Sequence, residues 1–288
     1  MLALKFAGWL TAAYAAILDR LERTSMQTVL TIAGFDPSSG AGVTADLMVF
    51  AAHGLFGISA ITALTVQSTL GVRASHTVAA TTLFETLECL RGDLPPAGIK
   101  IGMLADAASV RVVADFLETV PEGVPIVLDP VIRSSSGREL LSADGLLLLR
   151  SRVMPRVSWV TPNLDELAAL TGHEVTRRED VPGAAARLQE MGSGLNVLAT
   201  GGHLDRPDDL LRSAAGEVHW LAGERIVSRA THGTGCALSS ALLSRLVHGD
   251  APLDAALAAK AYVAEAIRTA APLGHGHGPL NHLWPQRR

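Results

Sequence analysis

The sequence predicts an α/β protein with a mostly parallel central sheet that is covered by helices on both faces. Strand-like segments rich in β-branched residues alternate with helical segments from residue 26 to the end of the chain. The 288 residues can bury a large core, and the 48% of hydrophobic residues are dispersed, as in globular proteins. Because no long linker or repeat interrupts the alternation, we expect residues 26–288 to form a single domain.

The composition excludes several classes of partner. A net charge of −4 and an aromatic content of 4% offer neither a basic face nor a stacking surface for nucleic acid. No uninterrupted apolar run reaches the roughly 18 residues that a membrane span needs. Two cysteines do not make a disulfide framework, so we expect reduced thiols in a cytoplasmic protein. A small molecule is therefore the expected ligand.

Residues 1–25 differ from the rest of the chain. An apolar stretch over residues 6–18 passes into the charged run 19–23 without the small residues of a signal-peptide cleavage site. We expect a helical N-terminal extension without a catalytic role, and Met26 follows it directly before the first strand.

The first strand is predicted over residues 28–33, which are β-branched and apolar. A loop dense in turn formers follows over 34–42, and then a helix over 43–52. The glycine spacing matches neither the dinucleotide fingerprint nor the Walker pattern. Asp46 lies early in this helix, where a carboxylate is favourable, so a first-turn charge is its simplest interpretation.

Two further strands are predicted over residues 58–66 and 98–104, with a helix that begins at a capping-box pattern and covers 82–91 between them. Gln67 follows the first of these strands. Ligands of α/β proteins bind beyond the carboxyl ends of strands, so its amide is placed to contact a ring, with a surface turn as the alternative. Met103 ends the second strand as an adaptable apolar contact or a core residue.

Oxygen-bearing side chains follow the next two predicted strands. The strand over 124–128 leads into Asp129, and the strand over 158–161 leads into Asn163 and Glu166. Side chains three residues apart at a helix start share a face, and hard oxygen ligands suit Mg²⁺. The alternative is an N-cap asparagine with a first-turn glutamate.

The C-terminal half continues the alternation. A helix is predicted over 184–191, a strand over 196–199, three short strands within 209–228 and a last helix over 253–270. The tail over 273–282 contains three histidines, but no carboxylate or thiol accompanies them, so we expect a closing loop and no metal site.

A glycine-rich turn precedes the helix predicted over residues 237–247. Its glycines bracket a threonine and leave backbone N–H groups free at a helix N-terminus, which is typical of a phosphate site. The last residue is a cysteine, whose pKa such a position can lower, so it is a candidate reactive or proton-accepting group. An ordinary turn before a core helix is the alternative. The candidate residues are Gly233, Thr234, Gly235 and Cys236.

Eight motifs in order carry a family resemblance. TIAGFDPSSGAGVTADL, ITALTVQSTLGV, KIGML, VLDPV, TPNLDE, TGGHL, THGTGCALSSAL and LGHGHGPLNH resemble the hydroxymethylpyrimidine/phosphomethylpyrimidine kinases of thiamine biosynthesis, members of the ribokinase-like superfamily. The resemblance implies a three-layer α/β/α fold and phosphorylation of 4-amino-5-hydroxymethyl-2-methylpyrimidine at its hydroxymethyl oxygen. The implied phosphate donor is ATP with Mg²⁺, and a second phosphorylation then gives the diphosphate.

The resemblance also implies the roles of individual residues. The anion-binding loop falls on the candidate turn above, with Cys236 where related sugar kinases have an aspartate base. Asn163 and Glu166 match an element near Mg²⁺ and phosphate, and Asp129 matches an acidic residue close to it. A carboxylate and a primary amide can pair with an aminopyrimidine. The implied pyrimidine site consists of Gly34, Asp46, Gln67 and Met103.

Two lysines of the family pattern are missing. Thr200 stands where many members carry a lysine before Gly-Gly-His, and Ser135 stands where some carry one after Asp-Pro-Val. A cation beside the transferred phosphoryl group contributes strongly to catalysis. We therefore expect Arg133 or a monovalent cation to replace the missing charge. Superfamily members are often dimers, so a homodimer is also expected.

Other functions stay open from the sequence. Pyridoxal kinase shares the implied fold, and some relatives with the cysteine act on both rings. A non-catalytic pyrimidine sensor is suggested by the two missing lysines. A sugar kinase is less favoured because Cys236 replaces the aspartate base, and a nicotinamide-dependent oxidoreductase lacks its fingerprint.

Overall fold

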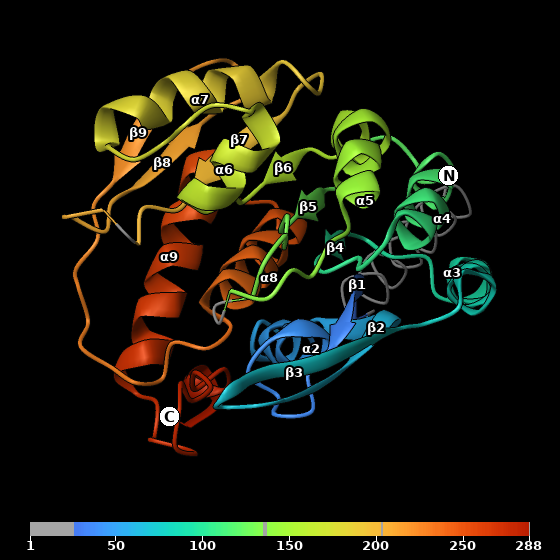
Figure 1. Ribbon diagram of the computed structural model, residues 1–288, viewed down its shortest axis with the longest axis horizontal. Helices are drawn as coiled ribbons and strands as arrows, with labels where there is room; N and C mark the ends of the chain where they lie inside the picture. The colour runs from blue at the N-terminus through green and yellow to red at the C-terminus, as the bar shows by residue number, and fades with distance from the viewer. Residues whose placement is uncertain (1–25, 135–136, 203, 288) are drawn as a thin grey trace, which may run out of the picture.

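Nine strands form one sheet in the part of the chain that the computed structural model describes, residues 26–134, 137–202 and 204–287. Their order is β3-β2-β1-β4-β5-β6-β7-β8-β9 (Figure 1). The predicted extension over residues 1–25 lies outside the described residues. The strands are β1 (Thr28–Phe35), β2 (Phe56–Ser68), β3 (Gly71–Thr77), β4 (Ile99–Ile101), β5 (Ile126–Leu128), β6 (Trp159–Val160), β7 (Asn196–Ala199), β8 (Asp209–Arg212) and β9 (Val218–Leu221).

The sheet is parallel at its centre and antiparallel at its edges. Strands β1, β2, β4, β5, β6 and β7 pair in parallel, whereas β3 pairs antiparallel with β2, and β8 and β9 continue antiparallel from β7. The central strands β4 to β7 are buried throughout, as expected for parallel strands covered on both faces.

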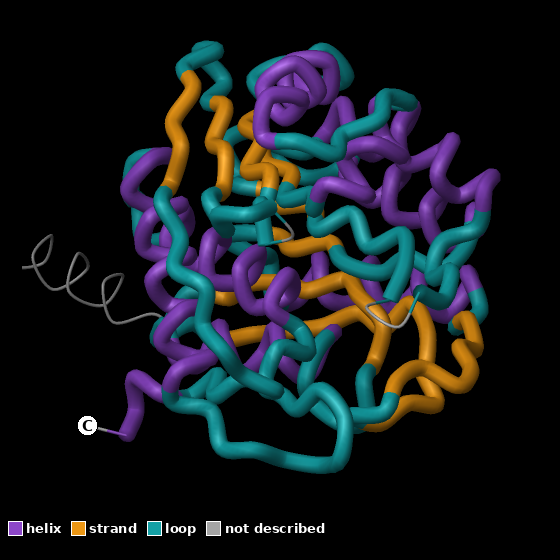
Figure 2. Tube along the Cα trace, turned by 60° about the vertical axis from the view of Figure 1, so that its left-hand side comes forward, coloured by secondary structure: helices purple, strands orange, loops and turns teal. Residues whose placement is uncertain are grey.

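Helices cover both faces of the sheet (Figures 1 and 2). One face packs against α2 (Gly42–Ala52), α8 (Thr234–Val247) and α9 (Pro252–Arg268). The other packs against helices that include α3 (Ala80–Asp93), α4 (Ala107–Leu117), α6 (Leu164–Thr171) and α7 (Val181–Gln189). The other helices in the described residues are short. They are α5 (Ala143–Leu148), η1 (Leu149–Val153), η2 (Met154–Arg156), η3 (Arg178–Asp180) and η4 (Trp284–Arg287). This arrangement confirms the predicted three-layer α/β/α class.

The strand order reverses at β1, which lies between β2 and β4. Parallel α/β sheets bind their ligands where the strand order reverses, beyond the carboxyl ends of the strands. The loops that follow β1, β2, β4 and β5 leave from that edge, so the fold itself marks the place of the site. Among the described residues no helix has the length and apolar character needed to cross a membrane.

Several elements differ from the sequence expectations. Strand β3 was not predicted, because its sequence GVRASHT lacks apolar alternation. Only two of the three strands predicted within 209–228 form, and the chain after β9 is irregular. Helix α3 begins at Ala80 and has no side-chain cap, so the capping-box pattern predicted at residue 82 lies inside the helix.

Candidate active site

Two glycine loops lie in direct contact at the carboxyl edge of the sheet. The first follows β1 and the second precedes α8. Gly233 has a left-handed φ of 85°, and a Cβ at this position would overlap the carbonyl oxygen of Gly40. A Cβ at Gly40 would in turn overlap the His232 ring. The predicted phosphate loop therefore adjoins the loop assigned to the pyrimidine, and Gly235 at its far end is exposed.

A histidine and an aspartate connect these loops to Gln67. The Nε2 atom of His232 lies 2.7 Å from Oδ2 of Asp36, and the other oxygen, Oδ1, accepts hydrogen bonds from the N–H and the hydroxyl of Ser38. Burial alone would raise the pKa of Asp36, but the hydrogen bonds from His232 and Ser38 hold it well below its usual range. Nε2 of Gln67 is 3.3 Å from Nε2 of His232. Asp36 and His232 were not predicted as site residues, because both stand among turn formers in the sequence.

Gly34 and Met103 meet at the ends of neighbouring strands. Met103 follows β4 and is 8% exposed in a small apolar cluster with Ala63 and Leu140. A Cβ at Gly34 would lie 3.0 Å from the Met103 sulfur. The glycine thus leaves room for the methionine, and together they form an apolar wall beside Gln67's strand.

Asp46 does not lie in the first turn of α2, as its simplest interpretation expected, and protein groups surround its carboxylate. The residue is fully buried, and α2 has no acidic residue in its first turn. Its carboxylate accepts hydrogen bonds from Thr31 at 2.6 Å, from Ser240 at 2.8 Å and from Lys100 at 2.9 and 3.1 Å. Three donor groups make four hydrogen bonds to the carboxylate, which use its roughly four acceptor positions, so Asp46 has none left for a pyrimidine.

Lys100 lies between two acidic side chains and was not identified from the sequence. Its side chain is fully buried, with Nζ 2.9 Å from Oδ2 of Asp46 and 4.0 Å from Oδ2 of Asp129. Burial disfavours the ammonium ion, but the neighbouring charges of Asp46 and Asp129 and the hydrogen bond to Asp46 hold the pKa of Lys100 above its usual value. A lysine within an otherwise apolar strand was the available signal.

Cys236 does not have the lowered pKa predicted from its position at the start of α8. Burial raises the pKa of the thiol to about 12, and Lys100 only partly offsets this while Asp129 and Asp46 add to it. The backbone of Gly42 donates a hydrogen bond to the sulfur, and the thiol donates one to Asp129. The substrate-free protein therefore holds a protonated thiol beside the phosphate loop.

Asp129 and Glu166 form a pair of buried carboxyl groups. A Cβ at Gly235 would lie 3.7 Å from Oδ1 of Asp129, so this carboxylate lies under the phosphate loop. Burial raises the pKa of Asp129, and burial together with the charge of Asp129 raises the pKa of Glu166 to about 8. The N–H groups of Asn163 and Ile132 point at Glu166 and favour its charged form. Each charged carboxylate thus makes the other less favourable.

Asn163 and Glu166 also form the capping box of α6. The Asn163 side chain accepts from the N–H of Glu166, and the Glu166 side chain accepts from the N–H of Asn163, both at 2.9 Å. The structural alternative for this pair is therefore confirmed. It leaves the second oxygen of Glu166 without a capping role. No group of three or more potential metal-ligating side chains occurs in the described ranges.

Thr200 and Arg133 lie on loops beside this pair. Thr200 pairs with Asn163 in an isolated bridge, and its N–H donates to Pro162. Arg133 has a side chain that is 66% exposed and lies 3.7 Å from Glu139. It directly follows Ile132, which contacts Glu166. Ser135 lies outside the described residues.

A groove of about 690 Å³ runs along α9. Its lining includes Gly223 and Lys260. The Lys260 ammonium is 2.6 Å from Asp209, whose other oxygen accepts from the N–H of Gly201, the residue after Thr200. The groove thus connects through one hydrogen-bonded chain to the carboxyl edge of the sheet.

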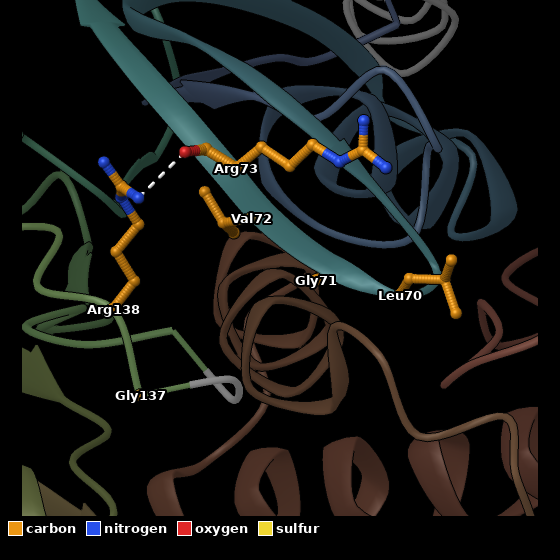
Figure 3. Close-up of a pocket in the computed structure, with 6 residues that line it drawn as sticks. All are labelled: Leu70, Gly71, Val72, Arg73, Gly137 and Arg138. Carbon is orange, nitrogen blue, oxygen red and sulfur yellow. Dashed lines mark hydrogen bonds between the residues drawn. The ribbon is translucent and has the colours of Figure 1, made fainter.

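A second pocket, of about 380 Å³, lies where the β2–β3 hairpin meets the loop after β5 (Figure 3). Nη1 of Arg138 donates a hydrogen bond to the backbone oxygen of Arg73 at 2.8 Å, while the Arg73 guanidinium points away. None of the predicted site residues lines this pocket. The hydrogen bond between Arg138 and Arg73 connects the hairpin to the neighbouring loop.

The C-terminal tail is the closing loop that the sequence predicted. Its N–H groups at Gly276 and His277 donate to Thr69 at the tip of the β2–β3 hairpin. The His277 ring is 3.0 Å from the hydroxyl of Thr231, and the N–H of His232 donates to Gly278. The tail therefore holds the hairpin and the phosphate loop together.

Known proteins are similar to this chain in both sequence and fold. The sequence profile described as phosphomethylpyrimidine kinase matches residues 36–281. The chain is 39% identical over 270 residues to the hydroxymethylpyrimidine/phosphomethylpyrimidine kinase of Haemophilus influenzae, covering 92% of this chain and 99% of that one. It is 39% identical to the thiamine biosynthesis bifunctional protein of Geobacter sulfurreducens over 93% of this chain, but spans only 55% of that longer protein.

Solved kinase structures superpose closely on the fold. The phosphomethylpyrimidine kinase of Clostridium difficile 630 gives a TM-score of 0.74 at 33% identity and covers 84% of this chain and 99% of its own. The Staphylococcus aureus pyridoxal kinase in complex with pyridoxal gives a TM-score of 0.81 at 27% identity, with coverages of 91% and 96%. The fold is thus ribokinase-like, as the sequence resemblance implied, and the chain belongs to the phosphomethylpyrimidine kinase family.

Proposed function

We propose that this chain transfers the γ-phosphoryl group of ATP to 4-amino-5-hydroxymethyl-2-methylpyrimidine and then to its monophosphate, in thiamine biosynthesis. The observation that carries the proposal is the contact between the two glycine loops. Because Gly233 lies against Gly40, a ring held beside the first loop has its hydroxymethyl group next to the N-terminus of α8. The kinase relatives support the same reaction.

The pyrimidine is proposed to lie between the Gly34–Met103 wall and Gln67. Met103 supplies an apolar, adaptable surface for a flat ring. Asp36 accepts hydrogen bonds and holds the amide nitrogen of Gln67 on its own side, so the amide oxygen remains to accept from an exocyclic amine. Asp46 acts through Lys100 and Ser240 in this proposal and does not touch the ring.

The phosphoryl group is proposed to lie at the N-terminus of α8. Backbone N–H groups in the turn of Gly233, Thr234 and Gly235 have no helical partner and favour negative charge. Phosphoryl transfer depends mainly on alignment and on neutralising charge in the transition state, which fixed N–H groups provide. The Cys236 thiol donates a hydrogen bond to Asp129 and lies at the same end of the helix.

The carboxyl groups of Asp129 and Glu166 fit a divalent cation. Two buried carboxyl groups that raise each other's pKa gain from a cation between or beside them. Mg²⁺ typically takes one or two carboxylates, with phosphate oxygens and water completing its shell. Asp129 and Glu166 would hold it, directly or through water, and it would neutralise phosphate charge.

The nucleotide is proposed to extend from this edge towards the groove along α9. Asn163 and Thr200 lie at the start of that route, and Lys260 and Gly223 line its far part. Arg133 is the exposed cation beside Glu166 and is proposed to compensate for the lysine missing at Thr200. Cys89 and Cys236 are free thiols, which supports the expected cytoplasmic location.

A homodimer is proposed to form through the β2–β3 hairpin. Leu64 and Val66 lie two residues apart on β2, so they share a face, and each is 49% exposed. Leu70, between the two strands, is 69% exposed. A second copy of the hairpin offers the same apolar residues, as a two-fold interface requires.

Mass-spectrometric detection of products tests the proposed reaction. With ATP and Mg²⁺, the aminopyrimidine should give first a monophosphate and then a diphosphate. Pyridoxal is the second candidate substrate, because the Staphylococcus aureus pyridoxal kinase superposes with a TM-score of 0.81, so it is assayed in parallel. Binding of the pyrimidine without turnover would instead identify a sensor, and faster turnover of pyridoxal would identify a pyridoxal kinase.

A further inference from the structure

Lys100 and Asp46 form an ion pair in the interior of the protein, below the phosphate loop. Both side chains are fully buried, and Nζ of Lys100 is 2.9 and 3.1 Å from the two oxygens of Asp46. Lys100 comes from β4 and Asp46 from α2. The pair therefore joins the sheet to the helix layer that also contains α8.

This pair is fastened to α8 itself. The hydroxyl of Ser240, in the second turn of α8, donates to Asp46 at 2.8 Å. The neighbouring Ser239 donates to Asp129 at 3.4 Å, and Asp129 is the second acidic partner of Lys100. Both serines are fully buried. Successive residues of α8 are thus held by two carboxylates that share one ammonium ion.

The chain leaves space for this ammonium ion. A Cβ at Gly102 would lie 2.8 Å from Nζ of Lys100 and 3.1 Å from the Cβ of Ala33. Gly102 has no left-handed φ, so its backbone does not require glycine. The absence of a side chain at this position is explained by the lysine head group.

We propose that Lys100 is a positioning residue for phosphoryl transfer: paired with Asp46, it sets the first turns of α8, and with them the N–H groups of the phosphate loop, against the sheet. The inference rests on the proposed function of that loop. Lys100 reaches the reaction through Asp46, Ser240 and Asp129, and it touches neither substrate nor nucleotide.

Stability alone is a poor explanation for such a pair. Replacing both members of a buried ion pair with apolar residues is often neutral or stabilising, whereas removing one member leaves an unpaired buried charge. The paired replacement Lys100→Met with Asp46→Leu therefore separates a positioning role from a purely structural one. A matched control is Arg245→Met with Asp250→Leu, because Arg245 and Asp250 form an ion pair at the other end of α8.

The paired variant and the control are compared in steady-state kinetics and in hydrogen exchange. In the Lys100/Asp46 variant we expect kcat to fall about tenfold or more, with the KM for the pyrimidine changed less than about twofold, since remote positioning affects the transition state. Amide exchange in the first turns of α8 should accelerate about tenfold while the far end stays protected. The control should change neither.

Several results would overturn the inference. Normal kcat with normal exchange would remove it, and a raised KM with normal kcat would make Asp46 a ring contact instead. Gly102→Ala provides a second variant if the first fails to fold: it keeps every charge and its methyl group displaces the ammonium group, with a second close contact to the Cβ of Ala33, so it should show the same loss of kcat. If the wild type forms no product, the proposed function fails, and the exchange measurement still decides whether Lys100 anchors α8.

Discussion

Cys236 lies where a helix N-terminus would lower the pKa of a thiol, yet its surroundings raise that pKa. The dipole of α8 acts on the sulfur, but burial and two nearby carboxyl groups outweigh it. The position therefore favours a thiol that donates a hydrogen bond. The thiolate form, which could act as a base, is disfavoured unless bound substrates change the local charge.

Replacing Cys236 with serine tests this role. The shorter C–O bond draws the hydroxyl away from Asp129 and from the N–H of Gly42, so we expect kcat to fall about tenfold, or about 1.4 kcal/mol in the barrier. The KM for ATP should change less than about twofold. Steady-state kinetics measure both, and Cys89→Ser, on the exposed face of α3, is the control. Full activity in the Cys236→Ser variant would leave the thiol with a packing role.

Glu166 makes the stability of the protein depend on pH. Its pKa is about 8 in the folded protein and 4.5 ordinarily, so the folded state binds this proton more tightly. The resulting contribution to the free energy of unfolding is complete below pH 4.5 and is lost as the pH rises through 8. Each unit of difference contributes about 1.4 kcal/mol.

We therefore expect Glu166→Gln to flatten the decline in stability across this window. Urea unfolding over a series of pH values measures the effect. Glu174→Gln, at an exposed position, should leave the decline unchanged. Saturating Mg²⁺ should reduce the decline in the wild type, because a cation favours the charged carboxylate. An identical pH dependence in wild type and Glu166→Gln would contradict this account.

At the scale of elements, apolar strands were predicted well and polar ones were not. The sequences of β1 and β7 are β-branched or apolar and buried, and their positions followed directly. Strand β3 has no buried residue and a largely polar sequence, so only its pairing with β2 identifies it. The segment after β9 has strand-like residues but no neighbouring strand, because β9 already forms the edge of the sheet.

The C-terminal tail depends on the absence of side chains at its glycines. A Cβ at Gly276 would overlap the backbone oxygen of Thr69. Gly276→Ala should therefore push the tail from the hairpin and lower the free energy of unfolding by about 1–3 kcal/mol. Chemical denaturation measures this loss. Gly183→Ala is the matched control: it lies in α7 with open space around it, so it should be neutral or stabilising by up to about 1 kcal/mol. Equal stability of the two variants would show that the tail adapts.

At the scale of the whole molecule, the site collects residues from both halves of the chain. The sequence placed Asp129 and Asn163 correctly after strands, because parallel strands deliver their carboxyl ends to one edge, whereas Gln67 lies within the last residues of β2 and not after it. It could not pair Lys100 with Asp46, since periodicity does not report which side chains from β4 and α2 meet. The order of the motifs identified the family. Only the folded structure distinguishes residues that position the site from residues that contact the substrate.

If the homodimer forms through the β2–β3 hairpin, a substitution in the apolar face of this hairpin should dissociate it. Val66→Glu places a charge in the apolar face, so we expect a dimer to become a monomer in size-exclusion chromatography with light scattering. Val218→Glu is the control, because Val218 is 42% exposed on the opposite edge strand β9. A wild-type protein that elutes as a monomer at all concentrations would remove the proposed interface.

The close contact between Gly40 and Gly233 limits which substitutions the substrate site can accept. Since even a methyl group at either position would collide with the opposite loop or with His232, neither glycine can be replaced without separating the two loops. The cluster of Ala63, Met103 and Leu140 tolerates substitution better, because Met103 has a flexible side chain and the cluster is small. Replacing Met103 or Leu140 with a smaller residue is the way to make room for a larger alcohol substrate, because it leaves the contact between the two loops unchanged.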